Sequence, residues 1–251
     1  MRKISASYII SNAGVPLKNG ILILNDDNSV ADIIDRKGSV KEIQDLEYYS
    51  GVLVPGFVDV FTFLSWPNMT ASQIDSNDLS GLELGESGDI QSIQKAINHL
   101  EAFGSKGAAD FFPTRQSEVL KANSKISFKD IRDISNHYPE ELETDFPNST
   151  LGRLFNNNNI FLNKAFCIGT GSLSSHLKLS VFDELKFLQN LNPNLNLEQL
   201  IKWASINGAV ALGFDHLGSF EIGKKPGVNL ITNLDYDNFC LQADSKLKVL
   251  V

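Results

Sequence analysis

The sequence Gly51-Val-Leu-Val-Pro-Gly-Phe-Val-Asp59, which continues as Val60-Phe-Thr-Phe-Leu64, decides the fold. Within residues 57–64 only Asp59 and Thr62 interrupt an apolar run, and a Pro-Gly pair marks its start. A short run that is apolar at successive positions is typical of a strand covered on both faces, as in a parallel sheet. The segment therefore predicts a buried strand of an α/β protein.

A helix and a second strand follow in the order expected of a strand-helix-strand unit. Residues 65–88 are rich in Ser, Asp, Asn and Gly and predict a surface loop. Asp89 is a candidate N-cap for a helix that ends before Gly104. Its apolar stripe consists of Ile90, Ile93, Ala96, Ile97, Leu100 and Phe103. Residues 107–112 predict the next strand, joined to the first by a right-handed crossover.

Capping residues predict further helices. Ser127 with Asp130 resembles a capping box and predicts a helix there, and Ser180 predicts another helix start. A further helical segment is expected over residues 196–213. The short apolar run 165–168 predicts a buried strand between these helices.

The two ends of the chain are rich in strand signals. Residues 21–24 follow a turn signal, Lys18-Asn-Gly20, and predict one strand of a meander. Near the other end, residues 220–222 and 228–231 flank a Gly- and Pro-containing reversal and predict two strands. We therefore expect β structure at both termini.

Composition and charge exclude several partners. The chain has a net charge of -8 at pH 7 and a pI near 5.0, so no nucleic acid or anionic membrane partner is expected. No apolar window of about 18 residues predicts a transmembrane helix, and we read no signal peptide after Met1. Cys167 and Cys240 are too few for a disulfide framework. The expected location is the cytoplasm.

Three stretches, in this order, resemble the amidohydrolase superfamily, such as the chlorohydrolases, cytosine deaminases and aminodeoxyfutalosine deaminase-like enzymes. Residues 51–59 resemble the entry into the family's first barrel strand, and Gly169-Thr-Gly-Ser-Leu-Ser-Ser175 resembles the last barrel strand and its loop. Residues 197–213, followed by 217–231, resemble the closing helices and the returning strand. The resemblance covers both ends of the chain and is thin between them.

The resemblance implies an α/β protein with a truncated, incomplete TIM-type (β/α) barrel and a small β-sandwich formed by both termini. The barrel domain would span residues 51–213, and residues 1–50 and 214–251 would form the composite β-sandwich domain. A complete barrel of eight units takes about 250 residues, so residues 51–213 leave room for roughly four to six units, with about five as our prediction. An incomplete barrel leaves an unpaired strand edge, which predicts a homo-oligomer.

The metal positions of the family carry unsuitable residues in this chain. Members use zinc or another divalent metal to activate a water molecule. The resemblance places their His-x-His pair at Phe61 and Phe63 and the aspartate of their last strand at Gly171. Neither a phenyl ring nor a glycine offers an electron pair to a cation. We therefore predict no metal cofactor and no catalytic residue of the family type.

Other polar residues are candidates for a pocket at the same end of the strands. Ser172 lies in the loop 169–175, His176 follows it, and Asp110 stands near the end of the second predicted strand. The Gly-x-Ser-x-Gly spacing of a nucleophile elbow is missing around Ser172, so a hydroxyl-bearing loop is favoured over a catalytic triad. A structural role is the alternative for each residue.

Two functions from different classes follow from this reading. The leading hypothesis is a catalytically inactive amidohydrolase-like protein whose remaining pocket or surface binds a small-molecule ligand or supports assembly. The alternative is an active hydrolase of non-peptide C-N bonds that uses a non-standard site, for example with His176 or Asp110. A gene product without a selected role is a third reading, which the sequence does not separate from binding.

Overall fold

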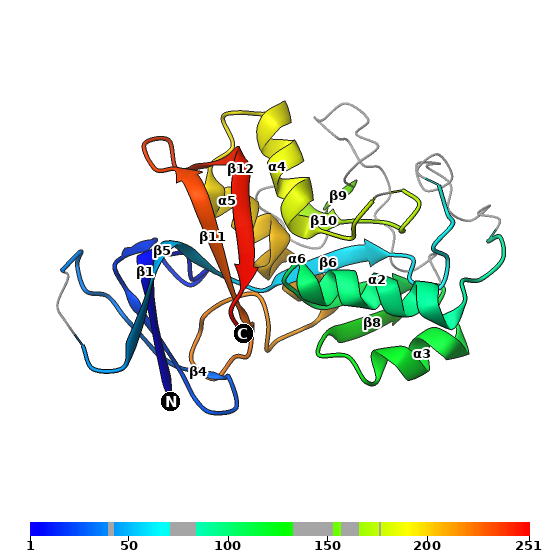
Figure 1. Ribbon diagram of the computed structural model, residues 1–251, viewed down its shortest axis with the longest axis horizontal. Coiled ribbons are helices and arrows are strands. Elements are labelled where there is room, and N and C mark those ends of the chain that lie inside the picture. The colour runs from blue at the N-terminus through cyan, green and yellow to red at the C-terminus, as the bar shows by residue number, and fades with distance from the viewer. Residues whose placement is uncertain (40–42, 71–83, 133–152, 157–165, 176) are drawn as a thin grey trace. The chain divides into compact units, whose positions relative to one another are not determined.

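The computed structural model describes residues 1–39, 43–70, 84–132, 153–156, 166–175 and 177–251. They form two compact units, one of Met1–Phe57 with Leu185–Val251 and the other of Val58–Glu184. The first unit therefore combines both ends of the chain, coloured blue and red in Figure 1. None of the described helices has the length and apolar character needed to cross a membrane.

The first unit is built on a seven-stranded mixed sheet. Its strands are β1 (Arg2–Ile9), β2 (Leu17–Lys18), β3 (Ile21–Leu24), β4 (Val30–Ile34), β5 (Leu46–Pro55), β11 (Val228–Asp235) and β12 (Cys240–Val249). The spatial order is β12-β11-β5-β1-β3-β4, and β2 pairs with β1. β1 and β5 are parallel, whereas β11 pairs antiparallel with β5. The predicted β structure at both termini is confirmed, and the two termini share one sheet. The predicted composite sandwich and its boundaries stay a prediction.

Helices α5 (Leu197–Ala204) and α6 (Ile206–Leu212) also belong to the first unit, and α4 (Val181–Leu191) spans the division at residue 184. The Asn196 side chain caps α5 by accepting the Gln199 N–H at 2.8 Å. Gly213 ends α6 in the left-handed conformation, with φ of 74°. The helical segment predicted over 196–213 is thus confirmed as two consecutive helices.

The second unit contains the strands that continue the opening segment. Its elements are β6 (Phe57–Thr62), α2 (Ile90–Ala102), β7 (Ser105–Phe111), α3 (Arg115–Lys121), β8 (Ser127–Ile131), β9 (Arg153–Asn156) and β10 (Phe166–Gly169). β6, β7 and β8 form one sheet in that order, and β9 pairs with β10. β7 and β8 are parallel. A parallel bridge between Thr62 and Gly171 joins the end of β6 to the residues that follow β10.

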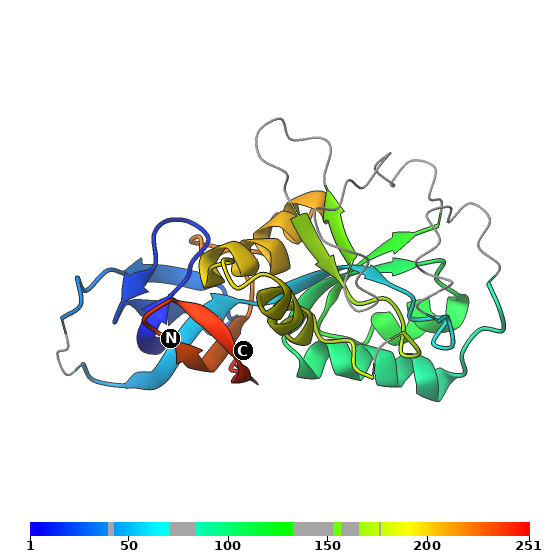
Figure 2. The same cartoon turned by 90° about the horizontal axis from the view of Figure 1, so that it is seen from above.

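Side chains on the two faces of the β6-β7-β8 sheet meet different surroundings. Leu64 and Ala108 pack against the apolar stripe of α2, and Asp110 contacts Lys121 of α3; we call this side the helix face. Figure 2 shows α2 and α3 along one side of these strands. Since alternate strand residues point to opposite faces, Phe61, Phe63 and Phe111 lie on the other side, the aromatic face.

Helix α2 confirms its prediction. The Asp89 side chain accepts the Ser92 N–H at 2.8 Å, as an N-cap does. Four members of the predicted stripe are buried, namely Ile93, Ala96, Ile97 and Leu100. Ile90 is exposed, because it begins the helix beyond the edge of the stripe.

Three sequence predictions are wrong or incomplete. Residues 127–131 form strand β8, because register pairing with β7 supplies their backbone hydrogen bonds and Asp130 binds Lys121 instead of capping a helix. Helix α3 was missing from the prediction, although Thr114 caps it through the Ser117 N–H. Residues 220–222 form no strand; β11 pairs with β12 instead.

Candidate functional site

The three residues that the sequence resemblance matches to the family's metal ligands lie together. The Phe63 N–H donates to the Gly171 carbonyl at 2.9 Å, and the Gly171 N–H donates to the Phe61 carbonyl at 2.8 Å. These two backbone hydrogen bonds hold the residue after β10 beside the end of β6. Two segments that are more than 100 residues apart in the sequence therefore meet at the end of β6.

An aromatic cluster fills this place. The ring centroids of Phe61 and Phe63 are 4.9 Å apart in an edge-to-face arrangement, and Phe111 packs on Phe61 at 4.7 Å. Phe112 adds a fourth ring, stacked on Phe63 at 6.3 Å. Phe61 and Phe63 are fully buried. The end of β6 is therefore closed by packed hydrocarbon.

The residues present do not fit the divalent metal that the fold family implies. Zinc takes nitrogen, sulfur or carboxylate oxygen ligands, and Phe61, Phe63 and Gly171 provide none of these. Gly171 has φ of 78°, a left-handed conformation that disfavours most side chains, so the backbone there suits glycine. In the part of the chain that the structure describes, no group of three His, Cys, Asp or Glu side chains is placed to hold a metal ion.

The segments that follow β6 and β10 are hydrogen-bonded to one another. The Ser172 hydroxyl donates to the Met69 carbonyl, and the Ser174 N–H donates to the Pro67 carbonyl at 2.8 Å. The Ser175 hydroxyl donates to the Ser172 carbonyl at 2.9 Å. Ser172 is fully buried, and its hydroxyl takes part in this turn. His176 lies outside the described residues.

A buried carboxyl group, Asp59, links β6 to the segment after β10. It accepts the Thr170 hydroxyl at 2.6 Å and the Thr170 N–H at 3.1 Å. Burial raises the pKa of Asp59 to about 7. Burial also raises the pKa of Glu184 to about 9, with smaller contributions from the negative charges of Asp59 and Asp183. This part of the unit therefore holds two acids that favour their neutral forms.

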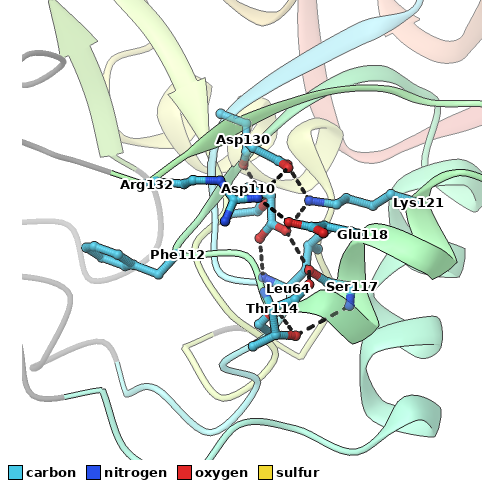
Figure 3. Close-up of polar contacts among 12 residues, drawn as sticks. Leu64, Asp110, Phe112, Thr114, Ser117, Glu118, Lys121, Asp130 and Arg132 are labelled. Carbon is cyan, nitrogen blue, oxygen red and sulfur yellow. Dashed lines mark hydrogen bonds and ion pairs between the residues drawn. The ribbon is translucent and has the colours of Figure 1, made fainter.

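Asp110 lies on the helix face, away from the phenylalanines. Figure 3 shows its carboxylate among donors from two segments, helix α3 and the residues that follow β6. Lys121 Nζ donates to Oδ2 at 2.7 Å, the Ser117 hydroxyl reaches the same oxygen at 3.3 Å, and the Leu64 N–H reaches Oδ1 at 3.1 Å. Lys121 also donates to Asp130. Asp110 and Ser172 are thus engaged in separate networks, and a pocket shared by them stays a prediction.

Sequence reasoning missed the roles of Lys121 and Asp130. Helix α3 was not predicted, and residues 127–131 were predicted as a helix, so the neighbours of both side chains were unknown. The register of β7 on β8 places Asp110 beside Asp130, and this register is a property of the tertiary structure.

The described residues form a partial TIM-like α/β fold in which aromatic rings pack together at the end of β6. The model of the amidohydrolase family matches residues 80–245. The chain belongs to this family, as the resemblance predicted.

One curated relative is similar over a short segment. This chain is 36% identical over 80 residues to 5-methylthioadenosine/S-adenosylhomocysteine deaminase from Thermoanaerobacter pseudethanolicus. The match covers 29% of this chain and 18% of the relative, so it spans only a small part of that protein's length.

Solved structures are similar at the level of the fold. Aminofutalosine deaminase from Helicobacter pylori matches with a TM-score of 0.55 and 13% identity over 94% of this chain and 93% of the other. Zinc-bound adenosine deaminase from Xanthomonas campestris gives a TM-score of 0.52 at 14% identity, covering 91% and 84% of the two chains. Zinc-bound atrazine chlorohydrolase from Arthrobacter aurescens gives 0.57 at 10% identity, covering 91% and 86%.

Proposed function

We propose that this protein is a catalytically silent member of the amidohydrolase family that acts by binding or assembly. One observation supports this most: the backbone still brings Phe61, Phe63 and Gly171 together, yet two packed rings and a left-handed glycine stand where the family needs electron-pair donors. Water activation by the family mechanism has no anchor there.

The finer architecture belongs to the same proposal. We propose a barrel of about five units spanning residues 51–213, completed by a composite sandwich of residues 1–50 and 214–251. An incomplete barrel exposes a strand edge, and pairing of that edge between copies would protect it. A homo-oligomer and a small-molecule ligand are therefore the proposed partners.

Metal content and hydrolysis test the proposal together. The full chain, purified with zinc in the growth medium and then dialysed, should hold far less than one equivalent of metal by elemental analysis. It should release no ammonia from adenosine-like or cytosine-like amines. One tightly held metal ion per chain would overturn the proposal, since the donors would have to come from elsewhere.

A matched variant makes a negative result informative. The double substitution Phe61→His and Phe63→His restores two nitrogen donors on one face of β6 and should raise zinc retention above that of the unsubstituted chain. Phe57→His, a buried change on the same strand outside the cluster, should not. Ammonia release by the unsubstituted chain would instead favour the alternative, an active C-N hydrolase with a non-standard site.

Assembly is tested separately by light scattering coupled to gel filtration. A mass of two or more chains over a range of protein concentrations supports the assembly role. A strict monomer contradicts it and leaves ligand binding as the remaining form of the proposal.

A further inference from the structure

Asp110, Lys121 and Asp130 form a group of reactive side chains in mutual contact through Lys121, on the face of the sheet opposite the phenylalanines (Figure 3). We infer that Lys121 and Asp110 condense inside the folded chain to an isopeptide bond, with Asp130 as the proton acceptor. The product is an intramolecular cross-link between β7 and α3. This inference is independent of the proposed function.

The three groups are already in contact. Lys121 Nζ lies 2.7 Å from Asp110 Oδ2 and also donates to Asp130 Oδ1. The side chains of Asp110 and Lys121 are 0% and 6% exposed, which keeps the reacting pair away from water. The centroid of the Phe128 ring lies 5.6 Å from Lys121 Nζ, so an apolar group borders the amine. Asp130 is 32% exposed and can pass a proton to solvent.

The contacts of Asp110 distinguish its two oxygens. The Leu64 N–H donates to Oδ1 at 3.1 Å, so a fixed backbone donor stands where negative charge develops when an amine adds to the carboxyl carbon. Oδ2 is the oxygen that faces the amine, and the Ser117 hydroxyl donates to it at 3.3 Å. Oδ1 is therefore placed to remain as the amide oxygen and Oδ2 to leave.

The step balances without any external reagent. The Lys121 ammonium gives one proton to the Asp130 carboxylate, and its nitrogen lone pair forms a bond to the carboxyl carbon of neutral Asp110. The bond from that carbon to Oδ2 breaks, and the hydroxyl leaves with a second amine proton as water. The third proton stays on the amide nitrogen, and Asp130 releases its proton to solvent. No electrons enter or leave.

Burial favours condensation over the ion pair. In water both groups are ionised and strongly solvated, but moving an ion pair into the interior carries a large desolvation penalty. Burial raises the pKa of Asp110, which favours the neutral acid that the amine can attack. Holding two reactants in contact is worth effective concentrations on the order of 10⁵–10⁸ M.

Mass spectrometry of the denatured full chain tests the inference directly. The expected mass is lower than that of the sequence by one water molecule. Tryptic digestion should join residues 107–115 to residues 116–125, with no cleavage after Lys121. The uncut linear peptide 107–125 has the same mass, so labelling of N-terminal amines distinguishes the two: the branched product carries two. A chain with the full sequence mass overturns the inference.

Substitutions assign the lost water to the trio. Asp110→Asn should lose one ammonia in place of water, because the leaving group is then an amide nitrogen. Lys121→Arg should keep the full mass, whereas Lys129→Arg, at an exposed lysine of β8, should still lose one water. Loss of water that persists in Lys121→Arg would place the dehydration elsewhere in the chain and overturn the assignment.

Discussion

Neighbouring residues of β6 and β7 face opposite sides of one sheet and meet opposite surroundings. On the aromatic face, the rings of Phe61, Phe63 and Phe111 pack against one another at the end of β6. On the helix face, where a barrel usually buries apolar packing, Asp110 is buried with a lysine and a second aspartate. Among the residues that the structure describes in this unit, the buried ion pair therefore lies on the helix face and not beside Phe61 and Phe63.

Two buried aspartates, Asp59 of β6 and Asp110 of β7, also differ in what surrounds them. Burial raises the pKa of both Asp59 and Asp110. The negative charge of Asp110 is offset by the positive charge of Lys121. Asp59 instead accepts hydrogen bonds from a hydroxyl and from backbone N–H groups, and its charge raises the pKa of a second buried acid, Glu184. A paired acid should be most sensitive to loss of its cation, and the acids near Asp59 should be most sensitive to pH.

The largest expected effect is from Lys121→Leu. Asp110 would stay buried as an unpaired acid, with neither the cation of the ion pair nor the amide bond of the cross-link, and breaking a buried pair from one side costs about 3–5 kcal/mol of unfolding free energy. Urea denaturation at neutral pH measures the loss. Adding Asp110→Leu should recover most of it, because the uncompensated acid is then gone. If Lys121→Leu were as stable as the exposed control Lys129→Leu, the buried pair of Asp110 and Lys121 would not stabilise the helix face.

An intermediate effect is expected from pH. The folded-state pKa values of Asp59, about 7, and Glu184, about 9, lie above the ordinary values of 3.8 and 4.5. Between those limits the folded chain binds more protons than the unfolded chain, so the free energy of unfolding falls as pH rises. Stability should therefore decrease from pH 5 to pH 9.

Glu184→Gln isolates one acid. Because a neutral amide cannot lose a proton, this variant should flatten the decline and gain about 1–3 kcal/mol relative to the unsubstituted chain at pH 9. Thermal unfolding at several pH values measures the slope. The exposed Glu86→Gln should keep the original slope, and an unchanged slope in Glu184→Gln would show that this acid is not buried in the way described.

The smallest effect is expected at the outer edge of the charged network. Arg132 pairs with Glu118, but the two side chains are 63% and 39% exposed. Exposed pairs contribute little to stability, because water and salt screen them. A double-mutant cycle with Glu118→Gln and Arg132→Gln should give a coupling close to zero, lower still in high salt. A coupling as large as the Lys121 effect would extend the buried network to the surface.

Local signals in the sequence were enough for several elements. Asp89 and Asn196 cap helices because their side chains bond backbone groups only two or three residues away. The apolar run 57–64 contains the fully buried strand β6. A strand that is buried on both faces does not alternate between polar and apolar residues, so the run itself was the signal. The helix prediction for residues 127–131 was wrong because Ser127 and Asp130 match a helix cap locally. Pairing with β7 is a long-range contact that the local pattern does not contain.

The sequence by itself determined the family and the lack of metal-ligand atoms in the side chains of Phe61, Phe63 and Gly171, because a donor atom is a property of the side chain alone. Only the tertiary structure decided that these residues lie side by side, and that Asp110 contacts Lys121, which also contacts Asp130, on the opposite face. The reason is physical: the register of β7 on β8 and the placement of α3 depend on packing between distant segments, and that packing sets which charges are buried together.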